Sequence, residues 1–128
     1  MGILDKLFGA RERERERVVP DHVGTLEDFE RVVKQAGGPA VLYVWGDACG
    51  PCKRMSHEVV AAATKHAGRV RFAELSTSGD RALLAALEIR ATPTLIVYDA
   101  GEELGRQTGF RPASWFDEMV AAEFPEPG

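Results

Sequence analysis

The chain has 128 residues, of which 45% are hydrophobic and 28% charged, and its 16 Lys and Arg against 20 Asp and Glu give a net charge of −4. This length and composition indicate one globular domain that can bury a core, and they exclude a disulfide-stapled miniprotein and a disordered chain. No stretch approaches the roughly 18 apolar residues of a membrane span, and the acidic pI near 5.4 gives no broad basic face. We therefore expect neither a membrane span nor a nucleic-acid partner.

The first 17 residues are predicted to be an extension that precedes a domain formed by residues 18–128. Four apolar residues at helical spacing predict a short amphipathic stripe, and residues 11–17 alternate strictly between Arg and Glu. The stripe consists of Ile3, Leu4, Leu7 and Phe8. It is typical of a flap that docks on the domain, with an interfacial anchor as the alternative. Asp5 and Lys6 interrupt the apolar run that a secretory signal needs, so we expect a cytoplasmic protein.

Predicted strands and helices alternate along the domain. Period-two or continuous apolar runs indicate the strands, and apolar residues at i, i+3, i+4 and i+7 indicate the helices. In chain order we expect an edge strand within 18–23, a helix over 26–36 behind a Thr25–Asp28 cap, a strand over 40–45, a helix over 52–63, a strand over 70–75, a short helix over 83–87 behind Asp80, strands over 94–98 and 104–109, and a last helix opened by Pro112. This order predicts an α/β fold, with a central mixed β-sheet flanked by helices on both faces.

The two cysteines stand three residues apart in Cys49-Gly50-Pro51-Cys52, between a predicted buried strand and a predicted helix. At a helix amino-terminus, unpaired backbone N–H groups and the helix dipole stabilise a thiolate. We therefore expect Cys49 to be the nucleophile, and Cys52, one turn further and facing the core, to be the shielded resolving thiol. A bridge across so short a loop would stabilise the fold by only about 2 kcal/mol, so a structural role explains it poorly.

A zinc site is the other common use of closely spaced cysteines. The chain has no second cysteine pair, and its three histidines, His22, His57 and His66, fall in separate predicted elements. We therefore expect no metal ligand among these residues and no tightly bound cofactor.

Several motifs follow one another in an order and spacing that a known family shares. They are Val44-Trp45, Cys49-Gly50-Pro51-Cys52-Lys53, Ile89-Arg90-Ala91-Thr92-Pro93-Thr94, the turn at Gly101, and Gly109. With these motifs, residues 19–124 resemble the thioredoxin family. A Cys-x-x-Cys pair is a moderately specific signal, and its combination with Thr-Pro about forty residues further on is highly specific. The resemblance implies a thioredoxin-like three-layer fold.

The resemblance also implies a substrate groove beside the cysteines. It implies that the Thr92–Pro93 bond is cis and faces the cysteines, which would leave the Thr92 backbone open to pair with an extended substrate segment beside Cys49. Gly109 is similar to the glycine that keeps this groove open, and Trp45 to the tryptophan beneath the active site, a plain core tryptophan being the alternative. Together with Gly50 and Pro51, these residues form the expected substrate-binding surface.

Three of the chain's departures from the family pattern concern the active site, and a fourth is His57, which stands where the family has a proline that kinks the helix. Ala48 stands where the family usually has a tryptophan, and Tyr43 and Glu74 stand where it has a buried Asp and a nearby Lys. Glu74 shares a predicted strand face with Phe72, and a carboxyl buried there is suited to exchange a proton with Cys52. The alternative is a carboxylate that reaches solvent.

The expected function is thiol–disulfide oxidoreduction, in which Cys49 attacks a disulfide in a protein substrate and Cys52 resolves the mixed disulfide. The resemblance implies that electrons come from NADPH through a thioredoxin reductase, and we expect a monomer. One alternative is a non-catalytic or redox-sensing binding module that uses the groove, because the three departures remove aids to turnover. Another is an isomerase or oxidant with a less reducing potential.

Overall fold

The computed structural model describes residues 17–126. The stripe over 3–8 and all but the last residue of the Arg/Glu run lie outside the described residues, so the boundary at residue 17 stays a prediction. The described elements are β1 (Asp21–His22), α2 (Leu26–Val32), the 3₁₀ helix η1 (Lys34–Ala36), β2 (Pro39–Trp45), α3 (Gly50–Lys65), β3 (Arg71–Ser76), α4 (Arg81–Ala86), β4 (Thr94–Asp99), β5 (Glu102–Thr108) and α5 (Ala113–Glu123).

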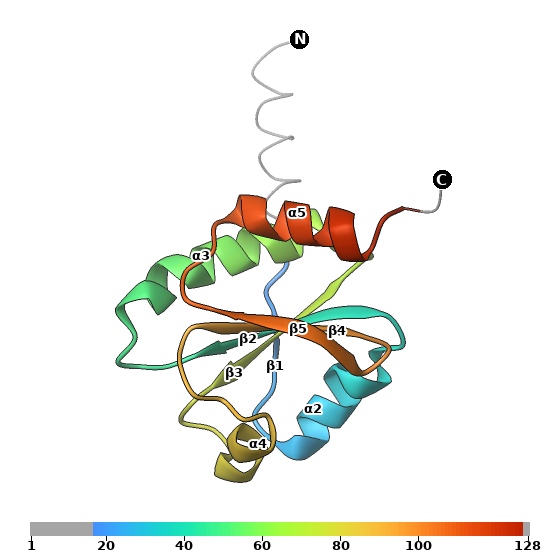
Figure 1. The fold of residues 1–128 in the computed structure, drawn as a ribbon. Helices are drawn as coiled ribbons and strands as arrows, with labels where there is room; N and C mark the ends of the chain where they lie inside the picture. Colours follow the sequence, from blue (N-terminus) through green and yellow to red (C-terminus); the bar gives the residue numbers. More distant parts are fainter. Residues whose placement is uncertain (1–16, 127–128) are drawn as a thin grey trace, which may run out of the picture.

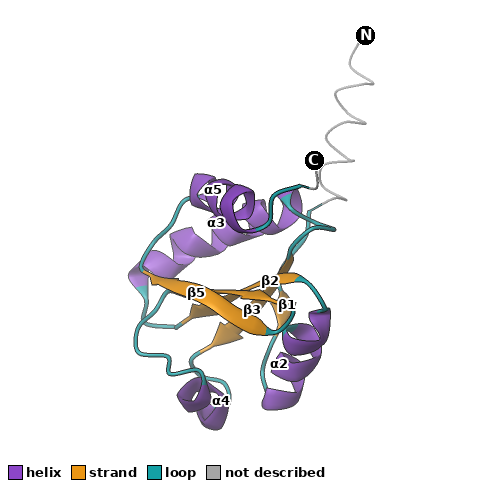
Figure 2. Ribbon diagram, turned by 45° about the vertical axis from the view of Figure 1, so that its right-hand side comes forward, coloured by secondary structure: helices purple, strands orange, loops and turns teal. Residues whose placement is uncertain are grey.

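The five strands form one mixed sheet in the order β1-β3-β2-β4-β5. The pairs β1–β3 and β2–β3 are parallel, and β2–β4 and β4–β5 are antiparallel. Helices α3 and α5 cover one face of the sheet, and α2 and α4 cover the other (Figures 1 and 2). The predicted α/β fold with a central mixed sheet flanked by helices on both faces is confirmed.

Strand β2 lies at the centre of the sheet and is buried on both faces. Because side chains alternate along a strand, Val41 and Tyr43 face the α3–α5 layer, while Leu42 and Val44 face the α2–α4 layer. This explains why residues 40–44 read as a continuous apolar run. The central position also matters for function, because the chain leaves β2 directly into the turn that carries the cysteines.

Local signals in the sequence set the helix boundaries. The predicted capping box before α2 is present, with the Thr25 side chain accepting from the Asp28 N–H and the Asp28 carboxylate accepting from the Thr25 N–H, both at 3.1 Å. The single helix expected over 26–36 is corrected to an α-helix that ends at Val32 and the 3₁₀ turn η1. Gly37 follows with φ +75°, the left-handed conformation that ends such a turn.

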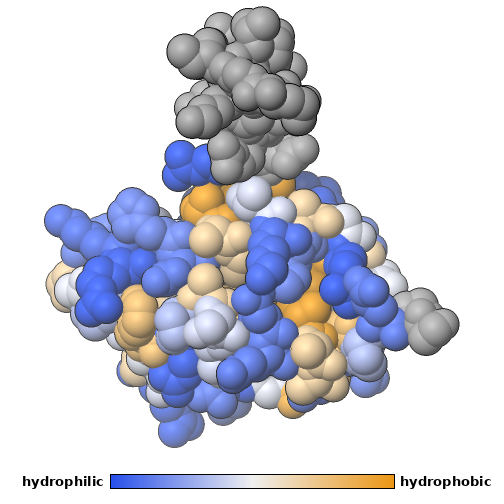
Figure 3. Space-filling model, turned by 90° about the horizontal axis from the view of Figure 1, so that it is seen from above, coloured by the Kyte–Doolittle hydropathy of each residue, from blue (hydrophilic) through white to orange (hydrophobic). Residues whose placement is uncertain are grey.

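The outer surface of the α3–α5 layer is mostly hydrophilic, with hydrophobic residues in small separate patches (Figure 3). Phe116, Met119 and Val120 of α5 are buried, and Trp115 is half-buried and packs against the same core. Within residues 17–126, every helix is too short or too polar to cross a bilayer.

Candidate active site

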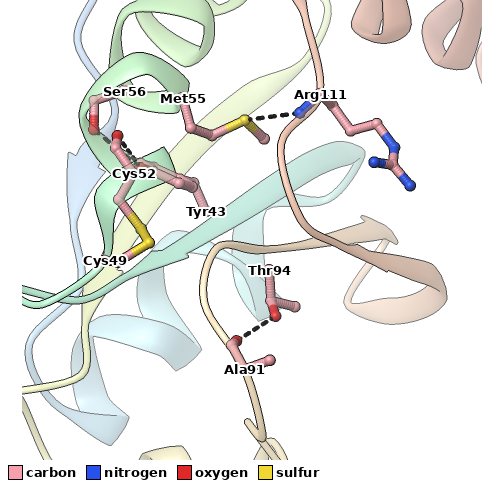
Figure 4. The surroundings of a disulfide bond; sticks show 8 residues. All are labelled: Tyr43, Cys49, Cys52, Met55, Ser56, Ala91, Thr94 and Arg111. Carbon is pink, nitrogen blue, oxygen red and sulfur yellow. Dashed lines mark hydrogen bonds between the residues drawn. A yellow bond between two sulfur atoms is a disulfide. The ribbon is translucent and has the colours of Figure 1, made fainter.

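The chain turns from β2 into α3 through residues 46–49, and Cys49 is the N-cap residue of α3. Its N–H donates to the Gly46 carbonyl at 3.3 Å, which closes the turn. Cys49 is bonded to Cys52, with Cα atoms 5.3 Å apart, and Pro51 lies in the first turn between them (Figure 4). Cys49 is half-buried, whereas Cys52 is only 4% exposed. The first cysteine residue is therefore more exposed than the second.

The loop before β4 packs against this turn. A Cβ atom at Gly46 would lie 2.9 Å from Thr77 Oγ1 and 3.4 Å from Thr92 Oγ1, so a side chain there would require the Thr77 side chain to shift and would touch Thr92. The Thr92–Pro93 bond is cis. Among the described residues, the N–H and C=O of Thr92 have no hydrogen-bond partner, and they are available to another chain.

Gly109 lies next to the Thr92–Pro93 loop. Its N–H donates to the Pro93 carbonyl at 2.9 Å, and its φ of +89° lies in the region that favours glycine. Two residues further on, the Arg111 N–H donates to Met55 Sδ at 3.2 Å (Figure 4). The loop between β5 and α5 is thus attached both to the proline loop and to α3, the helix that carries the cysteines.

Trp45, the last residue of β2, is half-buried and donates its indole N–H to the Glu74 carboxylate. The other Glu74 oxygen bonds His22 Nδ1. Glu74 pairs with Tyr43 across β2 and β3, on the α3 face of the sheet, as its spacing predicted. The Glu74 side chain is 21% exposed. The sequence allowed either a carboxyl buried in the core or a carboxylate that reaches solvent, and the structure is intermediate between these two alternatives.

A cavity of about 250 Å³ lies between this end of the sheet and α3. Its lining residues are Pro20, Tyr43, Trp45, Ser56, Val59, Val60 and Glu74. Glu74 is the only carboxylate in that lining. A larger hollow of about 450 Å³ adjoins residues 36–39 and 67–72, at the opposite ends of β2 and β3, so it is remote from the cysteines.

Tyr43 and Ser56 provide polar contacts that the sequence analysis missed. The Tyr43 hydroxyl donates to the Cys52 carbonyl at 2.9 Å and lies 3.0 Å from Ser56 Oγ (Figure 4). Burial raises the pKa of Tyr43 above its ordinary value. The sequence signal was the i, i+4 spacing of Cys52 and Ser56, which places both on one side of α3 above Tyr43.

The described residues contain no group of three or more His, Cys, Asp or Glu side chains that could hold a metal ion. What they do contain is a half-buried cysteine at the N-cap of a helix, bonded to a buried cysteine one turn further. This arrangement defines a dithiol/disulfide exchange site.

Comparisons with known proteins agree with that class. The family model described as Thioredoxin matches residues 21–122. The chain is 32% identical over 93 residues to the thioredoxin of Haemophilus influenzae, covering 73% of this chain and 87% of that protein. It is 30% identical over 88 residues to the thioredoxin of Streptomyces clavuligerus, covering 69% and 81%. The structure of a mutant thioredoxin from Halobacterium salinarum is 20% identical, covers 86% of this chain and 94% of that chain, and superposes with a TM-score of 0.75, which shows a shared fold.

The chain therefore belongs to the thioredoxin family. It is a thiol–disulfide oxidoreductase of the protein-disulfide reductase type, and Cys49 and Cys52 are its redox-active pair.

Proposed function

We propose that the protein reduces disulfides in other proteins, with Cys49 as the attacking thiolate and Cys52 as the resolving thiol. The observation that carries this assignment is the unequal exposure of the two cysteine residues. Cys49 is half-buried at the N-cap of α3, and Cys52 is 4% exposed one turn further. A substrate sulfur can reach the first and not the second, so attack begins at Cys49.

The reaction consists of two thiol–disulfide exchanges. In the reduced protein, the Cys49 thiolate bonds one sulfur of the substrate disulfide, the substrate S–S bond breaks, and the released substrate sulfur takes up a proton. The Cys52 thiol then loses its proton and attacks Cys49 Sγ. The Cys49–substrate bond breaks, the second substrate thiolate leaves, and the intramolecular disulfide seen here is formed. Two electrons pass from the protein to the substrate.

The groove around Thr92 is the proposed binding surface for the substrate. The unpaired N–H and C=O of Thr92 can add an extended segment as a strand, which brings a disulfide in that segment to Cys49. Gly109 leaves space for the segment because it has no side chain, and Gly50 and Pro51 are exposed beside it. Ala48, which stands where the family usually has a tryptophan, leaves the surface beside Cys49 less covered. Trp45 supports the groove from below through its bond to Glu74.

Glu74 is the proposed acceptor for the Cys52 proton. Glu74 lines the 250 Å³ cavity together with Tyr43 and Ser56, and it is the only carboxylate in that lining. Hydrogen bonds from Trp45 and His22 hold the Glu74 carboxylate in place. The test is Glu74→Gln, with the rate of the resolving step followed against pH. A changed pH profile supports the role, and an unchanged profile removes it.

The electron donor and the setting are the remaining parts of the proposal. Family membership supports an NADPH-dependent thioredoxin reductase as the donor, acting in the cytoplasm, where it would keep the pair reduced. The protein would act as a monomer with no bound cofactor. Enzymatic re-reduction of the Cys49–Cys52 disulfide by a purified thioredoxin reductase with NADPH tests the donor directly.

Reduction of insulin by dithiothreitol, with and without the protein, tests the main assignment. We expect clear acceleration by the wild type and by Ala61→Ser, an exposed control on α3, and none by Cys49→Ser. Cys52→Ser should accumulate a mixed disulfide with its substrate through Cys49. A wild type that does not accelerate insulin reduction and a Cys52→Ser variant that traps nothing would favour a binding module instead.

A further inference from the structure

Tyr43 carries a hydroxyl from the centre of the sheet to the helix turn that contains Cys52. Its ring is packed in the core under α3, and the residue is 2% exposed. The hydroxyl is directed at the Cys52 carbonyl, 2.9 Å away, and at Ser56 Oγ, 3.0 Å away (Figure 4). No other side chain of the described residues hydrogen-bonds the backbone of the Cys49–Cys52 loop.

The direction of these two hydrogen bonds follows from counting protons. A phenol has one O–H proton, and a carbonyl can only accept, so Tyr43 donates to Cys52. Ser56 must then donate its own proton to the Tyr43 oxygen. Burial raises the pKa of Tyr43, so the phenol keeps its proton while the protein works near neutral pH. The series of hydrogen bonds therefore runs from Ser56 through Tyr43 to the Cys52 carbonyl and ends there.

Hydrogen bonds that end on the Cys52 carbonyl fix the backbone of Cys52 and do not accept a proton from the Cys52 sulfur. This matters most in the mixed disulfide, when Cys49 is bonded to substrate and the Cys49–Cys52 bond is absent. Only the fold then keeps Cys52 Sγ within reach of Cys49 Sγ. Intramolecular attack is fast when the reacting atoms are held close and aligned.

We propose that Tyr43, supported by Ser56, is a positioning residue that holds the first turn of α3 so that Cys52 can attack the mixed disulfide. This inference rests on the proposed function, because it assigns Cys52 the resolving step. The inference distinguishes two roles near Cys52, positioning of its backbone and transfer of its proton. The hydroxyl pair fixes geometry, and any proton transfer belongs to a different group.

Stopped-flow reaction of the reduced protein with 5,5′-dithiobis(2-nitrobenzoate) measures the two steps separately. Attack by Cys49 releases one coloured thiolate at a rate that depends on probe concentration. Attack by Cys52 releases the second at a rate that does not. For Tyr43→Phe we expect an unchanged first step and a second step slowed about tenfold. The pH midpoint of the second step should not move, because Tyr43 is not the proton acceptor.

Tyr98→Phe is the matched control, because this tyrosine is also buried in the sheet but its hydroxyl has no partner among the described residues. Both of its steps should equal those of the wild type. Ser56→Ala should slow the second step less than Tyr43→Phe does, and it provides an independent test if Tyr43→Phe does not fold.

Three results would overturn the inference. The first is a second step that is unchanged in Tyr43→Phe or, where that variant does not fold, in Ser56→Ala. The second is an equal slowing of both steps, which indicates a general structural effect. The third is a shifted pH midpoint, which would make Tyr43 part of the proton transfer. Failure of the proposed function gives a different result, since the wild-type protein would then not accelerate the reduction of insulin by dithiothreitol.

Discussion

The two buried tyrosines on neighbouring strands of the sheet have opposite surroundings. Tyr43 in β2 faces α3, and its hydroxyl has two partners on that helix. Tyr98 in β4 faces the α2–α4 layer, where its ring meets Phe29 edge to face at 5.7 Å and its hydroxyl has no partner within residues 17–126. Burial raises the pKa of both phenols, and of Tyr98 more strongly.

This contrast indicates that the two faces of the sheet have different roles. Polar atoms on the α3–α5 face form contacts that lead to the cysteines, whereas the α2–α4 face is an apolar layer with one unsatisfied hydroxyl. This division predicts that substitutions on the α2–α4 face change stability without changing the redox chemistry. Substitutions at the polar contacts that lead to the cysteines, or at the proposed substrate groove, change the chemistry as well.

The largest expected effect is loss of stability from Phe29→Ala. Phe29 is fully buried under the α2 side of the sheet, so truncation removes its burial and leaves a cavity, which costs about 3–5 kcal/mol. Urea unfolding measures this loss. The alkylation rate of Cys49 by iodoacetamide in the folded, reduced protein should stay at the wild-type value. Glu30→Ala, at an exposed neighbouring position, is the control, and an altered Cys49 rate in Phe29→Ala would argue against the division.

The groove should respond to Gly109→Ala in both stability and function. A side chain at φ +89° costs about 1–2 kcal/mol, and the added methyl group stands in the proposed substrate path. We expect a higher KM for insulin and an unchanged rate for the first step with 5,5′-dithiobis(2-nitrobenzoate). Gly105→Ala is the control, because its Cβ would meet no atom within 4 Å. Equal KM values for the two variants would remove Gly109 from the binding surface.

Sequence patterns predicted those features that depend on neighbours along the chain. The Thr25–Asp28 cap, the N-cap position of Cys49 and the burial of Cys52 all follow from local spacing. The contacts of Glu74 with Trp45 and His22 depend on the register between three strands, which the spacing along any one strand does not specify. The end of the α-helix at Val32 was missed because Val33, at the junction, and Ala36, in the 3₁₀ turn, remain at helical spacing.

The helices on the redox face are joined by an ionic cluster whose contribution should depend on pH. Asp117 of α5 bonds Lys65 Nζ and His66 Nε2 of α3, both at 2.9 Å. The hydrogen bond from Lys65 is the main cause that lowers the Asp117 pKa below its ordinary 3.8. A lowered folded-state pKa means that the stabilisation is complete above the unfolded value and is lost as the pH falls through the folded value.

Asp117→Asn should therefore lower the melting temperature at pH 7 and differ less from the wild type as the pH approaches 3. The carboxylate is 39% exposed, so solvent screening limits the loss to less than about 1 kcal/mol. Thermal melts at several pH values measure it, with Glu118→Gln as a neighbouring control that has no ion pair among the described residues. Because the cluster only joins helices, the two steps of the redox reaction should not change. A difference from the wild type that grew at low pH would contradict the assigned direction.

Tyr98→Phe should give the smallest change and the most direct comparison with Tyr43→Phe. Removing a buried hydroxyl without a partner relieves its desolvation cost, while the ring contact with Phe29 is retained. A small loss of packing around the missing oxygen opposes this gain, so we expect a net shift within about 0.5 kcal/mol, toward greater stability. Urea unfolding of both variants tests the contrast. Tyr43→Phe should be destabilised, because it leaves the Ser56 hydroxyl and the Cys52 carbonyl each with one partner fewer. Equal losses in the two variants would mean that Tyr98 also has a partner in solution, and the two faces of the sheet would then differ less than their hydrogen bonds indicate.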